Sequence, residues 1–270
     1  MVRIVMSKNR KASAQVELFK TWLSRSGDSP LSISLRSFSG TYVLSHFLQS
    51  QFAIFSPRLE YLDLAIPCDA MYMVRSHMPL LRHLELTLTS IPFWGLDALT
   101  PFDRSPLLTH IVLERFYNQF ILQLPWTQFT HLEVQYLTLA ECAEILCDAI
   151  RLVHCTFGIR PSDQRMDIPL VPPHDRLQHL VLRPGLNQSQ DRDLWRLFDR
   201  LTLPALRTLE VFDFGLNPDS LEAFISRSRC SLHQLHVTEG NGMLSEILDD
   251  ERLPSVGRDV LEGSGLEVYS

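Results

Sequence analysis

The sequence predicts an α/β solenoid, with a curved parallel sheet on the concave side and helices and irregular loops on the convex side. Two observations predict it. A short leucine-containing phrase recurs along the chain at a nearly constant interval, and segments with a helical spacing of apolar residues lie between its copies. The composition agrees, because 45% hydrophobic and 21% charged residues are typical of a folded globular chain.

The recurring phrase is a leucine-like residue, two variable residues, a second leucine-like residue, one variable residue and a third leucine-like residue. Its copies begin at Leu59, Leu81, Leu108, Phe129, Leu152, Leu177, Leu206 and Leu232. Their spacing falls in the range of about 20–29 residues that is typical of leucine-rich repeats, and the copy at Leu152 is the least regular. We therefore expect one leucine-rich-repeat domain over 1–270, with about eight to nine repeats and the clear ones within 57–238.

The first elements precede the clear repeats. Apolar residues within 16–24 have helical spacing and predict a capping helix inside residues 1–30. Leu31, Ile33 and Leu35 alternate with serines and predict an opening strand. Each phrase is then expected to form a strand. Prolines stand before several of them and favour extended backbone at that point: Pro57, Pro79, Pro106 and Pro204.

Helices are expected on the other side of the strands. Residues 140–147 and 194–198 have apolar residues three and four apart, and Asn217-Pro218 resembles the start of a helix reaching Ser228. The proline-containing stretches 90–105 and 160–174 are expected to be loops. Residues 243–253 could form a last helix, within an atypical C-terminal cap over 239–270.

Strand periodicity assigns the side chains of each phrase to two faces. The fourth and sixth residues should point into the core, and the third and fifth should lie on the concave side. Five consecutive repeats carry a histidine at the third position, and carboxylates occupy several fifth positions. We take this face as the candidate partner-binding surface, with Tyr61, Asp63, His83, Glu85, His110, His131, Glu133, His154, His179, Glu210 and His236.

Three interpretations of the histidines remain open. They can be tolerated polar aromatic residues that stack across the strand spacing of about 4.8 Å. They can form a protein-binding surface that receives a basic or polar segment. Metal binding is the third and the least favoured, because a straight row brings only two imidazoles together at a time. We also hypothesise that partner binding depends on pH between about 5.5 and 7.5.

Several classes of function are disfavoured. A formal charge of −6, from 25 basic and 31 acidic residues, argues against binding to nucleic acid or to an anionic membrane surface. The sequence contains no phosphate-loop, nucleophile-elbow or zinc-protease motif, so we expect no catalytic, cofactor-binding or metal-binding residues and no enzymatic activity. No secretory signal or membrane-spanning stretch is visible. We expect an intracellular monomer, in the cytoplasm or nucleus, with reduced cysteines.

Several segments resemble the repeat region of F-box and leucine-rich-repeat proteins that are abundant in mushroom-forming (basidiomycete) fungi. The matching segments are 22–31, 124–133, 203–210 and 224–228, and the resemblance covers roughly residues 15 to 240. Membership of that family would imply the substrate-recognition subunit of a cullin–RING ubiquitin ligase, in which an F-box docks on the adaptor Skp1 and the repeats hold the target.

This sequence departs from the family plan at its N-terminus. The residues before the first expected helix do not resemble an F-box, so docking on Skp1 by the family's route is not expected. The alternatives are a stand-alone repeat scaffold and a truncated F-box protein product with no ligase role. A second departure lies at 148–150, where the family would more often have a Cys-Pro turn.

Overall fold

The structure is a computed structural model, and it describes residues 2–6, 12–37, 51–74, 76–90, 100, 102–114, 123–160, 167–184, 194–212 and 217–238. The possible helix at 243–253 and the expected C-terminal cap at 239–270 lie outside these residues. The chain divides into two compact units, 1–134 and 135–270, and each is described by itself.

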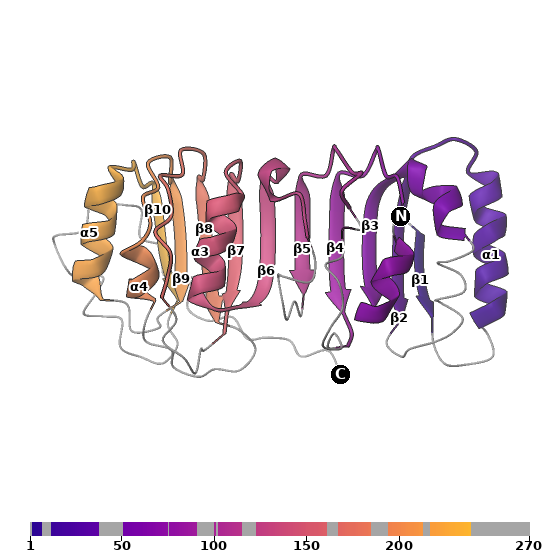
Figure 1. Cartoon of the computed structure of the whole chain (residues 1–270), viewed down its shortest axis with the longest axis horizontal. Helices are drawn as coiled ribbons and strands as arrows, with labels where there is room; N and C mark the ends of the chain where they lie inside the picture. Colours follow the sequence, from indigo (N-terminus) through magenta and orange to yellow (C-terminus); the bar gives the residue numbers. More distant parts are fainter. Residues whose placement is uncertain are drawn as a thin grey trace. The chain divides into compact units, whose positions relative to one another are not determined.

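The first unit is built on parallel strands that neighbour one another in sequence order (Figure 1). These strands are β1 (Val2–Met6), β2 (Leu31–Ser37), β3 (Leu59–Ile66), β4 (His83–Leu88), β5 (His110–Glu114) and β6 (His131–Leu137), whose last residues belong to the second unit. Helix α1 (Ala12–Arg25) joins β1 to β2, and residues 51–55 are helical. Short 3-10 helices occupy Ser56–Arg58, Cys68–Val74 and Trp126–Gln128.

The second unit repeats this arrangement of parallel strands joined by helical segments. Strands β7 (His154–Ile159), β8 (His179–Pro184), β9 (Thr208–Phe212) and β10 (Gln234–Thr238) are again parallel and in sequence order. The helices are α3 (Leu139–Asp148), α4 (Trp195–Phe198) and α5 (Pro218–Ser228). The predicted class is confirmed: the fold is α/β, with a solenoid-like order of parallel strands.

The hydrophobic core follows the repeat phrase. Every fourth- and sixth-position side chain is buried, from Leu62 and Leu64 in β3 to Leu235 and Val237 in β10. Helix α3 packs on this same side of the sheet, because its Cys142 lies near Cys155, the fourth-position residue of β7. Burial of a leucine side chain contributes about 1.5–3 kcal/mol, so these positions supply much of the hydrophobic stabilisation. The predicted assignment of the fourth and sixth positions to the core is confirmed.

A tight turn precedes the strands. The prolines lie in this turn, so the expectation of extended backbone at the prolines was wrong. The first-position residue donates its backbone N–H to the carbonyl three residues earlier at Leu59, Leu81, Leu108, Phe129, Leu152 and Leu206. In four of these turns the proline is the second residue: Pro57, Pro79, Pro106 and Pro204. The proline ring fixes φ near the value that this turn position needs. The same turn precedes Leu152, so the least regular copy of the phrase shares this local structure.

Helices α3 and α5 begin directly after residues whose side chains cap the helix N-terminus. Thr138 caps α3 with a reciprocal pair of bonds: its side chain accepts from the backbone N–H of Glu141, and the Glu141 carboxylate accepts from the backbone N–H of Thr138. Asn217 caps α5 through the backbone N–H of Asp219, with Pro218 at the first helical position, as the sequence indicated. Strand β1 is the element that the sequence analysis missed.

Candidate functional site

The structure places the candidate residues on one face within each unit. Third- and fifth-position side chains point away from the buried fourth and sixth positions, and nearly all of the candidates are half-buried. The exception is Asp63, whose side chain is only 7% exposed. The strand register places the third residue of each phrase beside the third residue of the phrase on the neighbouring strand. His83 pairs in this way with His110, and His154 pairs with His179. We call this surface the histidine face.

In the first unit, the third-position rings form a continuous stack, here called the ring stack: Tyr61, His83, His110 and His131. The centroids are 4.9 Å apart from Tyr61 to His83, 5.8 Å from His83 to His110 and 4.0 Å from His110 to His131. Neighbouring planes differ by 22° or less. The parallel ladder brings equivalent side chains to about the strand spacing, which flat rings fill by stacking.

Threonines at the second position fix two of these rings. The hydroxyl Oγ1 of Thr109 lies 3.0 Å from Nδ1 of His110, and Oγ1 of Thr130 lies 2.9 Å from Nδ1 of His131. A hydroxyl can donate to a neutral imidazole nitrogen or accept from a protonated one, so the contact holds the ring in either state. The two closest rings of the stack are therefore oriented by bonds as well as by packing.

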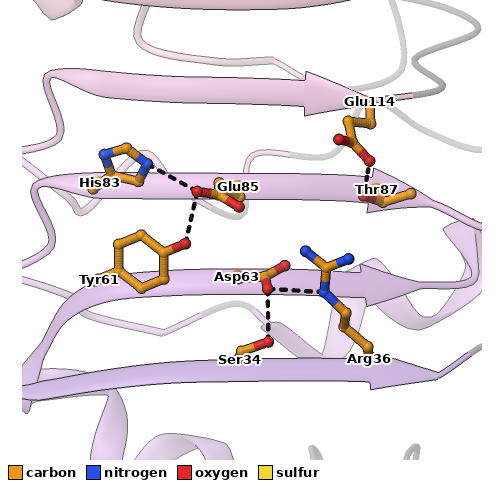
Figure 2. A network of polar contacts seen from close by, with 8 residues as sticks. All are labelled: Ser34, Arg36, Tyr61, Asp63, His83, Glu85, Thr87 and Glu114. Atoms are coloured by element: carbon orange, nitrogen blue, oxygen red, sulfur yellow. Dashed lines mark hydrogen bonds and ion pairs between the residues drawn. The ribbon is translucent and has the colours of Figure 1, made fainter. Parts of the chain in front are cut away.

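Carboxylates border the ring stack on β3 and β4, as Figure 2 shows. The Tyr61 hydroxyl donates to Oε1 of Glu85 at 2.6 Å, and Nε2 of His83 lies 3.4 Å from the same oxygen. Asp63 accepts at Oδ2 from the Ser34 hydroxyl at 2.6 Å and from Nε of Arg36 at 2.9 Å. These bonds explain how Asp63 tolerates burial, since a buried carboxylate needs a paired charge and hydrogen-bond donors.

The sequence analysis missed four residues of this network: Ser34, Arg36, Thr87 and Glu114. Ser34 and Arg36 lie on β2, outside the clear repeats, and Glu114 lies two residues beyond the fifth position of its repeat. Oε2 of Glu114 accepts from the Thr87 hydroxyl at 3.0 Å (Figure 2). Extending the six-residue phrase by one residue would have found Glu114, because strand side chains alternate and the seventh residue shares the face of the third and fifth.

The second unit carries a smaller version of the same surface. His154 and His179 stack at 4.2 Å with an angle of 8° between their planes. Arg183 lies 3.4 Å from Glu210 across β8 and β9. His236 is half-buried on β10. Of the predicted row of histidines, three therefore stack with Tyr61 in the first unit, and two stack as a pair in the second.

Burial and like charge lower the pKa of two stacked imidazoles, one in each unit. The pKa of His110 is lowered by loss of solvent and by the charge of His83. The pKa of His179 is lowered by loss of solvent and then by His154 and Arg207. Burial and the bond to Glu85 raise the pKa of the Tyr61 phenol, so it remains a donor. The imidazoles of His110 and His179 are therefore harder to protonate than a free histidine side chain.

Neither metal nor membrane chemistry emerges from the part of the chain that the structure describes. It holds no group of three or more histidine, cysteine or acidic side chains able to bind a metal ion. The five cysteines are free thiols, and burial raises the pKa of Cys142 and Cys155 well above the usual value. Within the described residues no helix has the length and apolar character that crossing a bilayer requires.

Comparison with known proteins leaves the chain without an assigned family. No protein-family model matches the sequence, and no curated protein is significantly similar to it.

Proposed function

We propose that this chain is a protein-recognition module that binds its partner through the histidine face. The observation that supports this most is the ring stack. Four flat, half-buried rings are held in register by a parallel sheet, and two of them are also fixed by threonine hydroxyls. Side chains that are already held in place lose little conformational entropy when a partner binds.

The resemblance to the repeats of F-box proteins suggests the setting. In that setting, the face holds a protein target for ubiquitination by a cullin–RING ligase, inside the cell. Five free thiols fit a reducing compartment. The alternative within the same proposal is a stand-alone repeat scaffold, monomeric and with no ligase role, which needs only the binding face.

Capture from a cell lysate tests the proposal. The immobilised chain is compared with a face variant, His110→Ala with His131→Ala, and with a control variant, His77→Ala with His233→Ala. Both variants lose two imidazoles, but His77 and His233 lie outside the ring stack. We expect mass spectrometry to find proteins that the wild type and the control retain and the face variant loses.

The identity of the captured proteins separates the two settings. Skp1 and a cullin among the face-dependent or face-independent proteins would support the ligase setting. A reproducible face-dependent partner without them would support the stand-alone scaffold. If every captured protein binds all three chains equally, the histidine face does not recognise a partner and the proposal is wrong.

A further inference from the structure

Three arginines of the second unit lie where neighbouring strands begin. Arg151 and Arg176 are the last turn residues before the first-position leucines of their phrases, and Arg207 is the second-position residue of the next phrase. All three residues are exposed to solvent. We call Arg151, Arg176 and Arg207 the arginine edge.

The strand ladder brings the arginine edge together. Arg151 and Arg176 stand three residues before the two histidines of the stacked pair, which are in register, so these arginines occupy equivalent places in neighbouring repeats. Their Cα atoms are therefore separated by close to one strand spacing, about 4.8 Å. The backbone N–H of Arg207 donates to the carbonyl of Gln178, two residues beyond Arg176. One strand spacing and two residues of rise place the Cα atoms of Arg176 and Arg207 about 8 Å apart.

The guanidinium groups of the arginine edge have no bonding partner within the described part of the chain. None of them forms a hydrogen bond or an ion pair with a described residue. Two exposed aspartates, Asp148 and Asp175, lie within three residues of them in the sequence, and neither is paired with them. Three positive charges therefore remain available to an anion from outside.

The corresponding arginines of the first unit are engaged by the chain itself. Arg58 is the last residue of its turn, and its Nη2 donates to the Ser26 hydroxyl at 2.7 Å and to the Ser29 carbonyl at 2.9 Å. Arg82 is the second-position residue of its phrase, and its Nε lies 3.7 Å from Oε1 of Glu60. The same two positions thus serve internal contacts in the first unit, and in the second unit they present unpaired cations.

The arginine edge adjoins the histidine face. The pKa of His179 is lowered by loss of solvent, and then by His154 and by the charge of Arg207. The Arg207 guanidinium therefore lies near the stacked pair. A partner segment that touches the stacked pair would pass within reach of this guanidinium.

We infer that the arginine edge binds an acidic stretch of the partner protein, which lies across the starts of β7, β8 and β9 and pairs its carboxylates with the three guanidinium groups. This inference rests on the proposed protein-recognition function and names the chemistry of the partner at the second unit. A guanidinium binds a carboxylate through two parallel hydrogen bonds. An extended segment presents every second side chain to one side, about 6.6 Å apart, which is close to the spacing of the arginines. The net charge of −6 disfavours a nucleic acid as the bound anion.

A labelled peptide tests the inference directly. A rhodamine-labelled peptide of three Glu-Thr repeats, here called the glutamate peptide, is titrated with the chain and binding is read by fluorescence anisotropy. Low ionic strength is used, because exposed charges are least screened there. A peptide of three Gln-Thr repeats is the matched probe, since glutamine keeps the size of glutamate and lacks its charge. We expect the glutamine peptide to bind at least tenfold more weakly.

Two triple variants separate specific from general attraction. The edge variant carries Arg151→Gln, Arg176→Gln and Arg207→Gln. The charge control carries Lys20→Gln, Arg25→Gln and Arg104→Gln, which changes the net charge equally in the first unit. The edge variant should keep the urea midpoint of the wild type, because its arginines are exposed and make no bonds within the described residues. We expect a loss of at least tenfold in affinity for the glutamate peptide in the edge variant and less than threefold in the charge control.

Three results would overturn the inference. Equal losses in the edge variant and the charge control would show that the glutamate peptide is attracted by the overall charge alone. Binding that neither variant changes would show that the arginine edge does not take part. Tighter binding of a peptide of the same length with one phosphoserine in place of the glutamates, or of a labelled hexa-deoxythymidylate, would show that the arginine edge prefers phosphate to carboxylate.

Failure of this inference can be told from failure of the proposed function. The edge variant and the charge control are also used in the lysate capture, and partners that only the edge variant loses would support the inference. If partners depend on His110 and His131 but bind the edge variant normally, the histidine face recognises proteins without the arginine edge and the inference is wrong. If no partner depends on the histidine face while the glutamate peptide still depends on the arginine edge, the proposed function fails and the acidic-peptide site stands.

Discussion

Truncation of Leu84 to alanine tests the repeat assignment on which the site depends. Leu84 is the fourth-position residue of β4 and has no solvent exposure. Its register neighbours, Leu62 and Ile111, are buried as well. The substitution removes the transfer free energy of the lost carbons and leaves a cavity that a close-packed core closes only in part. We expect the free energy of unfolding to fall by about 2–5 kcal/mol.

The measurement is urea denaturation followed by far-ultraviolet circular dichroism, with the midpoint compared at constant m value. Val112→Ala is the matched control, because Val112 follows Ile111 in the neighbouring strand but lies half-buried on the histidine face. It should cost less than about 1 kcal/mol. Leu180→Ala, at the fourth position of β8, should repeat the large effect in the second unit. A Leu84→Ala loss no greater than that of Val112→Ala would refute the assignment of faces.

Three further predictions concern caps, charges and pH. Thr138→Ala removes the acceptor for the backbone N–H of Glu141, and it should lower the free energy of unfolding in urea by about 0.5–2 kcal/mol; an unchanged midpoint would contradict the cap. Asp63→Ala leaves the Arg36 side chain without its carboxylate and should cost about 1–3 kcal/mol in the same assay, more than Asp63→Asn, which keeps an acceptor. The pKa of His110 is lowered in the folded chain, so the unfolded chain binds the proton more readily and stability should fall as the pH drops below about 6.5. His110→Gln should flatten part of this fall, and an identical pH profile would contradict the lowered pKa.

Partner binding by the histidine face should depend on pH. Protonation of His110 adds positive charge to this face, so the amount of face-dependent partner captured from a lysate should change as the pH falls from about 7.5 to 5.5. Lysate captures at several pH values across this range give the measurement. An unchanged amount of captured partner would show that protonation of the face does not affect binding.

Much of the fold could be predicted because the repeat phrase encodes local geometry. Strand alternation sends the fourth and sixth residues to the core and the third and fifth to the other face, and the burial of residues such as Leu180 and Leu209 follows that alternation. The helix starts at Thr138 and Asn217 depend on short-range capping bonds. Strand β1 lacks the repeat phrase, and its only local signal is the β-branched side chains of Val2, Ile4 and Val5, which favour a strand. Its parallel pairing with β2 is a tertiary contact that this signal does not specify.

The candidate site, like the fold, could be predicted from the sequence only in part. The sequence by itself determined which side chains share a face and that histidines occupy adjacent third positions, because the ladder of a parallel sheet repeats at a fixed spacing. Only the tertiary structure decided that Asp63 is buried against Arg36 of the preceding strand. It also decided that one Glu85 oxygen contacts both Tyr61 and His83. The distances of 4.0 to 5.8 Å between the centroids of stacked rings are a third such feature. All of these contacts except that of His83 with Glu85 join residues more than twenty positions apart. Their geometry depends on strand register and side-chain conformation, which no local pattern specifies.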